Sequence, residues 1–485
     1  MSQSNTPFRR MTSLKSADEF RAYAAELGID LPLDDKPLTA DESPMAQSHT
    51  LPDGFVIGNR WCVQPMEGWD CSAEGRPTDL TVRRWQGFGR SGAKLVWGGE
   101  AAAVQHDGRA NPRQLRAGEE YVGGLVDLRQ ALVDAHVESF GGTDGLLVGL
   151  QITHSGRFSK PNRDDRPEPR IAYHHPVLDR RLKIAPDDPV LTDQEIEEII
   201  AHFGDAARAA QEAGFDFVDV KHCHGYLGHE LLSARSRPGP FGGSFENRTR
   251  FVSLIVKDVR RKAPGMRIGF RFSAFDTPPY KPGPDGTGVP DEHPLPYTYS
   301  FGGDPDAPLK PKLDEPIRLL QLLKELGVWL VNVSLGSPYY TPHLIRPAQY
   351  PPSDGYQPPE DPLVGVARHV AVTAELKRAV PDLTIVGSGY TYLQEWVPHV
   401  AQHVIRTGMA DFVGLGRMML PYPEMPADIL AGRGLARKRI CRTFSDCTTA
   451  PRKGLVSGCY PLDAFYKQRP EAGTLARLKK ESRKS

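Results

Sequence analysis

Two neighbouring stretches decide the fold: Gln194-Glu195-Ile196-Glu197-Glu198-Ile199-Ile200 and Phe215-Asp216-Phe217-Val218-Asp219-Val220-Lys221. The first places isoleucines at the spacing of one helix face, so it predicts an amphipathic helix over residues 194–213. The second is a short apolar run rich in Phe and Val, which is typical of a buried strand. A helix that leads directly into such a strand is typical of a fold in which strands and helices alternate.

The same alternation recurs along the chain and indicates an α/β fold. Repeated strand and helix units imply parallel strands with right-handed crossovers, and eight units fit a (β/α)8 TIM barrel. A doubly wound sheet is the alternative. The predicted helices are 194–213, 245–262, 315–326 and 364–379, and the predicted strands are 61–66, 93–97, 145–151, 215–221, 267–272, 329–334, 383–386 and 412–415.

Polar residues decide between the two architectures. In a TIM barrel the chemistry lies at the carboxyl ends of the strands. Polar side chains gather at those ends here, which favours the barrel: Glu67, Gln151, His154, Lys221, His224, Arg271 and Arg417.

The remaining segments frame this barrel. Residues 1–50 hold one helical stretch over 18–27 and a linker, and are interpreted as an N-terminal arm. Residues 51–435 form the predicted barrel and 436–485 a short C-terminal extension that contains cysteines. A proline-rich loop over 274–314 follows strand five, and its length predicts a lid over the substrate.

Composition excludes several classes of function. The 485 residues carry 60 Lys and Arg against 60 Asp and Glu, so no net charge attracts nucleic acid. The sequence contains no run of about 18 apolar residues, so it predicts no membrane span. Arg9-Arg10 is followed by no apolar segment of an export signal, and six cysteines are too few for a disulfide scaffold. We therefore expect a cytoplasmic protein with a small-molecule substrate, with a homo-oligomer left open.

Short motifs recur at the strand ends, in the order Pro65-Met66, Gly99-Glu100-Ala101, Gln151-x-x-His154-x-Gly156-Arg157, His224-Gly225-Tyr226-Leu227, Gly242-Gly243-Ser244-Phe245-Glu246-Asn247-Arg248, Gly269-Phe270-Arg271-Phe272-Ser273, Gly387-Ser388-Gly389 and Gly414-Leu415-Gly416-Arg417. In this order and at these intervals, over residues 51–435, the set resembles the old yellow enzyme family of FMN-dependent ene-reductases and NADH:flavin oxidoreductases. This resemblance implies a barrel that binds FMN and takes hydride from NADH or NADPH.

These motifs contain the residue types that would bind the ring and the phosphate of a flavin. An isoalloxazine ring requires an amide at N3/O2 and a cation at N1/O2, roles that suit Gln151 and Arg271. Its phosphate requires glycine-turn N–H groups and a guanidinium after strands seven and eight. Candidates for these contacts are Gly387, Ser388, Gly389, Gly416 and Arg417, and the resemblance adds Pro65, Met66, Glu67 and Ala101.

Two positions depart from the family pattern. The residue after Pro-Met is commonly Thr or Cys near flavin N5/O4, whereas this chain has Glu67. An ionised carboxylate there would disfavour a negatively charged reduced flavin, and a protonated one could donate a hydrogen bond. The family has His-x-x-His or His-x-x-Asn before Gly-Tyr-Leu, where this chain has Lys221 and His224. His222 is either a partial substitute or a packed histidine.

The resemblance also implies the catalytic groups. Lys221 and His224 would hold the carbonyl oxygen of an enone, and Tyr226 would protonate the α-carbon. His154 and Arg157 receive no role, and Ser244 is expected only to cap a helix.

The cysteines near the C-terminus form an incomplete cluster motif. Barrels fused to further flavin domains carry a four-iron cluster on Cys-x2-Cys-x3-Cys-x11-Cys. Cys447 and Cys459 have the last spacing, but Ile440 and Thr443 fill the first two positions and Cys441 is one residue off. We therefore expect no iron–sulfur cluster and no metal.

The leading hypothesis is hydride transfer from NAD(P)H through FMN to an α,β-unsaturated carbonyl compound. The alternatives are an FMN-dependent amine dehydrogenase or demethylase, a Schiff-base lyase that uses Lys221, and a flavin-binding module without catalysis.

Overall fold

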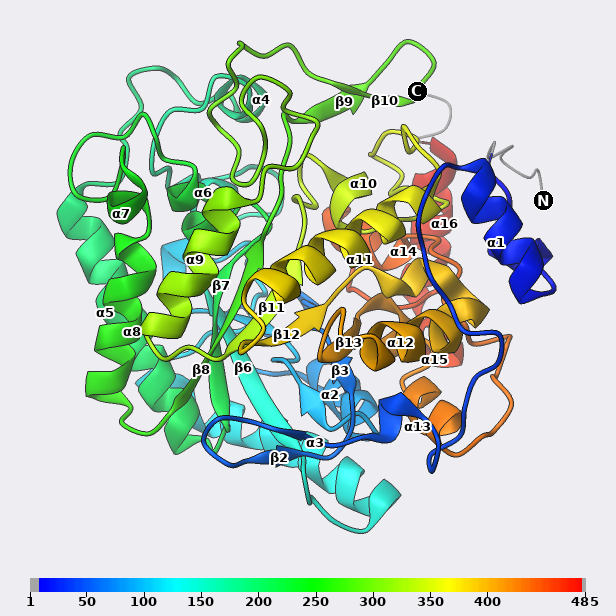
Figure 1. Cartoon of the computed structure of the whole chain (residues 1–485). Coiled ribbons are helices and arrows are strands. Elements are labelled where there is room, and N and C mark those ends of the chain that lie inside the picture. The colour runs from blue at the N-terminus through cyan, green and yellow to red at the C-terminus, as the bar shows by residue number, and fades with distance from the viewer. Residues whose placement is uncertain (1–7, 482–485) are drawn as a thin grey trace.

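Eight parallel strands close into a barrel in this computed structural model, which describes residues 8–481 (Figure 1). The sheet closes because the second strand pairs with the first and the third, with Leu95 opposite Leu147. All eight predicted strands are therefore confirmed, with small shifts at their ends. They are β3 (Trp61–Val63), β4 (Leu95–Val96), β6 (Leu147–Thr153), β7 (Phe217–His222), β8 (Arg267–Ser273), β11 (Leu330–Ser334), β12 (Thr384–Gly387) and β13 (Phe412–Leu415).

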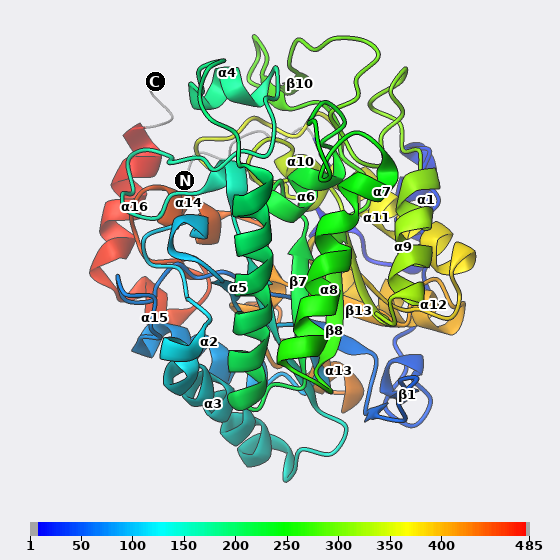
Figure 2. The ribbon, with the colours of Figure 1, turned by 90° about the vertical axis from the view of Figure 1, so that its left-hand side faces the viewer.

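Helices cover the outside of the barrel, and α5 and α8 lie along β7 and β8 in Figure 2. Helix α5 begins in a capping box between Thr192 and Glu195. Ser244 caps α7 by accepting from the backbone N–H of Asn247, as expected, and the predicted helix over 245–262 is interrupted at Thr249. These helices are α2 (Asp79–Gly89), α3 (Val122–Phe140), α5 (Asp193–Glu212), α7 (Phe245–Arg248), α8 (Arg250–Lys262), α9 (Asp314–Glu325), α11 (Pro362–Ala379) and α12 (Val397–Arg406).

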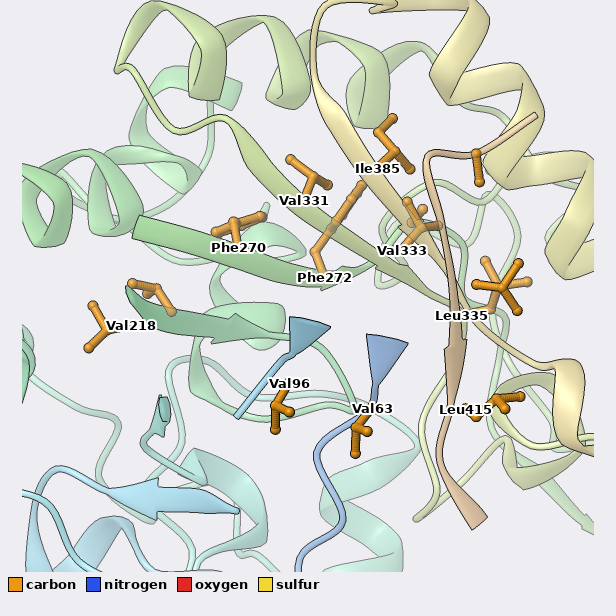
Figure 3. Close-up of a cluster of buried hydrophobic side chains, with 14 of the residues drawn as sticks. Val63, Val96, Val218, Phe270, Phe272, Val331, Val333, Leu335, Ile385 and Leu415 are labelled. Atoms are coloured by element: carbon orange, nitrogen blue, oxygen red, sulfur yellow. The ribbon is translucent and has the colours of Figure 1, made fainter. Parts of the chain in front are cut away.

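Apolar side chains fill the layer between strands and helices. Figure 3 shows part of this layer, a cluster of buried hydrophobic side chains on and next to the barrel strands. The labelled residues are Val63, Val96, Val218, Phe270, Phe272, Val331, Val333, Leu335, Ile385 and Leu415. Burying one such side chain stabilises the fold by roughly 1.5–3 kcal/mol. Together these contacts hold the strands in the register that aligns their carboxyl ends.

A hairpin closes the amino-terminal end of the barrel. The strands β1 (His49–Thr50) and β2 (Val56–Ile57) pair antiparallel at this end, which is the lower end in Figure 1. A second apolar cluster contains Leu51 and Ile57 from this segment together with Trp97 and Phe217 from the barrel. Chemistry is therefore restricted to the opposite, carboxyl end.

Long connections cover the carboxyl end. The loop over 274–314 has no helix before α9 begins at Asp314, but it contains a hairpin that the sequence did not predict. It attaches to the connection after β11 because the N–H of Tyr280 donates to the carbonyl of Tyr340 at 2.9 Å. The elements of this end are α4 (Leu178–Leu182), α6 (Leu227–Leu232), β9 (Tyr280–Pro282), β10 (Gly288–Pro290) and α10 (Pro342–Ile345).

The two terminal segments pack on the barrel. In the arm, α1 (Ala17–Glu26) matches the predicted helix, and Tyr23 donates a hydrogen bond to Asp361 at the start of α11. The C-terminal segment forms α13 (Met425–Leu430), α14 (Asp446–Arg452), α15 (Ala464–Lys467) and α16 (Pro470–Glu481). The short 3-10 helices are η1 (Met11–Ser13), η2 (Pro44–Ala46), η3 (His106–Gly108), η4 (Glu119–Tyr121), η5 (Gly156–Phe158), η6 (Tyr390–Trp396) and η7 (Arg417–Met419).

No helix within residues 8–481 has both the length and the apolar character that a membrane crossing requires.

Candidate flavin site

Three adjacent strands form one wall of the site. Gln151 on β6 donates through Nε2 to Asp219 Oδ2 on β7 at 2.5 Å. The backbone N–H of Arg271 on β8 donates to the other oxygen of Asp219 at 2.7 Å. Burial raises the pKa of Asp219. This carboxylate fixes the two expected flavin-contacting residues relative to each other, a role that the sequence analysis missed.

A break between two strands brings the backbone close to Gln151. Residues Ala101–Ala103 form β5, which continues past β4 and pairs with β6. A Cβ on Gly98, whose φ is +151°, would lie 2.6 Å from the backbone nitrogen of Gln151. The carbonyl of Ala101 accepts from Gln114 at 2.7 Å, so this carbonyl is occupied within the protein.

Arginine and glycine residues form the opposite wall, after β12 and β13. Arg417 donates through Nη2 to the carbonyl of Pro347 at 2.8 Å. Its Nη1 is buried and has no partner among residues 8–481. A Cβ on Gly416 would lie 3.1 Å from the sulfur of Met66, so glycine lets this turn approach the segment of Pro65 and Met66.

The hydroxyl of Ser388 does not face outward from this wall. It accepts from Gln64 Nε2 at 3.0 Å and donates to Asn332 Oδ1 at 3.3 Å. Asn332 in turn donates to Gln64 Oε1 at 2.8 Å. These buried amides cross the barrel interior and leave only backbone groups of Gly387, Ser388 and Gly389 for a phosphate.

The expected catalytic residues of β7 gather around Glu67. Lys221 donates to Glu67 Oε1, and its Nζ lies 4.0 Å from the ring centroid of Tyr226. The hydroxyl of Tyr226 lies 3.2 Å from Glu67 Oε2 and 2.9 Å from the hydroxyl of Tyr339. The indole of Trp69 donates to Glu67 at 3.1 Å. Glu67 therefore accepts from three side chains, and sequence reasoning missed both Trp69 and Tyr339.

His224 completes this group with an available nitrogen. Its backbone lies in the left-handed region at φ +70°, which is uncommon for a residue other than glycine and is often found at functional sites. Burial, followed by the charges of Lys221 and Arg271, lowers the pKa of His224 well below its usual value. The imidazole is therefore neutral, and its Nε2 is buried without a partner in the described part of the chain.

The neighbouring histidine, His222, is a packing residue. β7 ends at His222, whose ring centroid lies 4.6 Å from that of Phe270 and 5.6 Å from that of Phe251. The strand end explains why His222 and His224 point differently. His154 lies 3.6 Å from Asp107, and Arg157 forms ion pairs with Asp179 and Glu230, so both have structural partners.

A buried ionic network positions the loop of Glu67. Arg84 on α2 pairs with Asp70 at 2.5 Å and with Glu100. The backbone N–H of Gly68 donates to Glu100 at 3.1 Å. Because Gly68 directly follows Glu67, this network fixes where the carboxylate of Glu67 lies.

The three C-terminal cysteines lie beside the site. Cys441 and Cys459 are buried, whereas Cys447 is half-buried and lines a cavity of about 470 Å³ together with Met66 and Glu67. Burial raises the pKa of the Cys441 thiol to about 11. Within residues 8–481 no group of three or more His, Cys, Asp or Glu side chains has the arrangement of a metal site.

These residues fit FMN. The buried N–H groups of Arg271 Nε and Arg417 Nη1, which have no partners among the described residues, lie on opposite walls, where a flavin ring and a phosphate would accept from them. Gln151 retains its amide oxygen as an acceptor for the N–H of a flavin ring. The site is that of a flavin-dependent oxidoreductase built on a TIM barrel.

Comparison with known proteins gives the family. Residues 57–289 match the NADH:flavin oxidoreductase / NADH oxidase family. The NADPH dehydrogenase of Geobacillus sp. (strain WCH70) is 30% identical over 383 residues, which span 77% of this chain and 90% of that protein. The chain belongs to the NADH:flavin oxidoreductase family, which confirms the resemblance to old yellow enzymes, and it is an NAD(P)H-dependent oxidoreductase with FMN as its cofactor.

Solved structures confirm the fold at low sequence identity. A 2-naphthoyl-CoA reductase complex has a TM-score of 0.63 at 18% identity over 89% of this chain, and the chain covers 58% of it. An old yellow enzyme homologue from Zymomonas mobilis has a TM-score of 0.55 at 19% identity, covering 81% of this chain and 94% of the homologue. Histamine dehydrogenase from Rhizobium sp. 4-9 has a TM-score of 0.60 at 19% identity over 87% of this chain, which spans 53% of it.

Proposed function

We propose that this oxidoreductase delivers hydride to an activated alkene, namely the β-carbon of an α,β-unsaturated carbonyl compound. The observation that carries this proposal is the grouping of Lys221, His224 and Tyr226 at the end of β7, with the charge of Glu67 already neutralised by Lys221.

Two side chains would hold the carbonyl oxygen. When bound, FMN takes a hydride from NAD(P)H and passes it to the substrate. Negative charge then develops on the carbonyl oxygen, so donors placed there in advance lower the barrier. Lys221 uses one N–H for Glu67 and retains two others, and a neutral His224 protonated at Nε2 would donate from its unpartnered nitrogen.

Tyr226 would supply the proton to the α-carbon. Burial, followed by the charge of Glu67, raises the pKa of Tyr226 well above its usual value, so the phenol keeps its proton until the substrate takes it. The hydroxyl of Tyr339, 2.9 Å away, would return a proton to Tyr226.

Amine oxidation is the second candidate. A carboxylate beside Trp69, Tyr226 and Tyr339 is the kind of site that attracts a cationic amine. Lys221 already occupies that position as an ammonium over the Tyr226 ring, which counts against an amine. The same ion pair disfavours a Schiff-base lyase, because a protonated amine has no free electron pair for attack on a carbonyl.

One experiment separates these reactions. The purified protein is reduced anaerobically with NADH or NADPH, and reoxidation of the flavin is followed with cyclohexenone, other enones and trimethylamine. Rapid reoxidation by enones supports the proposal. Flavin reduction by the amine without a nicotinamide would favour the second candidate, and substrate trapped on Lys221 by borohydride would favour the lyase.

A further inference from the structure

A second arginine lies beside the phosphate end of the flavin site. Arg346 directly follows α10, in the connection after β11. The next residue, Pro347, accepts the hydrogen bond from Arg417 at 2.8 Å. The backbone that carries Arg346 is therefore fixed against the arginine of the family motif.

The glycine turn after β12 contacts the same segment from another side. A Cβ on Gly389 would lie 2.7 Å from the ring of His369, so this turn packs against that histidine. His369 Nε2 lies 2.8 Å from the carbonyl of Leu344 in α10. Arg346, two residues further along, thus belongs to the wall that contains Gly389 and Arg417.

The guanidinium of Arg346 is anchored on one side and available on the other. Its Nη1 donates to the hydroxyl of Thr448 on α14, in the C-terminal segment. Its Nη2, like Nη1 of Arg417, is buried without a partner in residues 8–481. Unpaired buried donors are costly, so two of them in one wall indicate a missing acceptor.

The local charge indicates that this acceptor is an anion. Burial, followed by the charges of Arg452 and Arg417, lowers the pKa of Arg346 to about 9. The positive charge of Arg452 is balanced by Asp354, to which it donates at 3.2 Å, and Arg452 also donates to the carbonyl of Pro338 at 2.6 Å. Among the described residues, the hydrogen bonds of Arg346 and Arg417 go to neutral oxygens, the hydroxyl of Thr448 and the carbonyl of Pro347, and neither arginine has an ion pair with a carboxylate. Two positive charges therefore remain without a counterion.

We propose that Arg346 and Arg417 together bind one phosphate monoester dianion, and that Thr448 of the C-terminal segment holds Arg346 in place. The charge of the two guanidinium groups matches that of a dianion, and their paired N–H groups suit phosphate oxygens. This proposal depends on the chain being a member of the NADH:flavin oxidoreductase family that binds FMN, and it does not depend on the alkene substrate. The phosphate of FMN fits this position, and the 2′-phosphate of NADPH is the other source of the same chemistry.

Binding of FMN and riboflavin tests the proposal, because the two flavins differ only in the phosphate. Flavin-depleted wild-type protein, Arg346→Met and Arg346→Lys are titrated with each flavin, and flavin fluorescence is followed. We expect Arg346→Met to weaken FMN binding by about 10- to 100-fold and to leave riboflavin binding unchanged, because only a charge-assisted phosphate contact is lost. Arg346→Lys should retain part of the FMN affinity, and Thr448→Val should show a smaller loss in the same direction.

Controls separate phosphate binding from a structural role. Arg469→Met removes an arginine of the C-terminal segment that pairs with Glu471, and FMN affinity should not change. If Arg346→Met and Thr448→Val both leave FMN affinity unchanged but raise KM for NADPH and not for NADH, the site takes the nicotinamide phosphate. Equal losses for FMN and riboflavin, or unchanged affinity for FMN together with unchanged KM for both nicotinamides, would overturn the proposal.

Discussion

Lys221 on β7 and Glu67 after β3 form an ion pair at the carboxyl end of the barrel, although they lie 154 residues apart in the sequence. Both positions depart from the residues that are common in the family. In the structure the two departures compensate each other, because the carboxylate that would oppose a negatively charged flavin is neutralised by the lysine that replaces a histidine. A single exchange at either position would leave a buried charge.

This pairing predicts a coupled effect on stability. The Lys221 side chain is 1% exposed and that of Glu67 is 16% exposed, so Glu67→Ala should lower the free energy of unfolding by about 3–5 kcal/mol. Lys221→Met in the Glu67→Ala background should recover part of this loss, because the unpaired ammonium is removed. Urea unfolding at saturating FMN measures both variants, and strictly additive losses would show that the pair is not coupled.

The two donors for the substrate oxygen should matter for one half-reaction only. Lys221→Met and His224→Ala should each slow flavin reoxidation by an enone by about 10²-fold, the scale for losing a preorganised donor to an oxyanion. FMN content should remain intact, because both variants retain Gln151, Arg271 and Arg417, the residues expected to hold the flavin. Stopped-flow absorbance of the flavin provides the rates; unchanged reoxidation in both variants would place the substrate elsewhere.

The two tyrosines should differ in effect. Tyr226→Phe removes the proposed proton donor and should slow reduction of weakly activated enones by about 10²-fold, while flavin reduction by NAD(P)H is spared. Tyr339→Phe keeps that donor and should have a smaller effect. A solvent isotope effect on reoxidation in the wild type, lost in Tyr226→Phe, would identify the proton transfer, and equal rates in all three proteins would exclude both tyrosines.

The barrel could be predicted because its strands are buried on both faces and read as apolar runs. Gln151, Arg271 and Arg417 stand out in the sequence because each is a polar residue within or just after an apolar run, toward the carboxyl end of a strand, and their contacts with the flavin stay predictions. Asp219 and Asn332 were hidden inside the runs, where a polar residue gives no sign of its partner. The contacts of Glu67 with Lys221 and of Arg346 with Thr448 join distant segments, and no local pattern encodes them.

The cysteine segment provides a prediction about metal content. With Ile440 and Thr443 in place of two thiols, Cys441, Cys447 and Cys459 supply at most three ligands, one fewer than a four-iron cluster requires. Protein purified without oxygen should therefore contain neither stoichiometric iron nor acid-labile sulfide. Elemental analysis measures the iron content, and about four irons per chain would show that a cluster forms despite the altered spacing of the cysteines.

Asp276 should make stability depend on pH. Its Oδ2 accepts from Tyr340 at 2.6 Å, its Oδ1 accepts from Thr341 at 3.1 Å, and His229 Nε2 lies 3.9 Å away. Burial raises the pKa of Asp276 to about 7. Between its unfolded pKa near 4 and pH 7, the unfolded chain releases this proton while the folded protein keeps it.

The free energy of unfolding should therefore fall as pH rises through this window, by at most about 1.4 kcal/mol per pH unit from this group. Burial lowers the pKa of His229 to about 4, which acts in the opposite direction. We therefore compare wild type with Asp276→Asn, in which His229 is retained. The difference in urea midpoint between the two proteins should shift in favour of Asp276→Asn from pH 4 to pH 7, whereas the exposed Asp306→Asn should show no such trend. A constant difference across the window would mean that Asp276 is already ionised in the folded protein at pH 4.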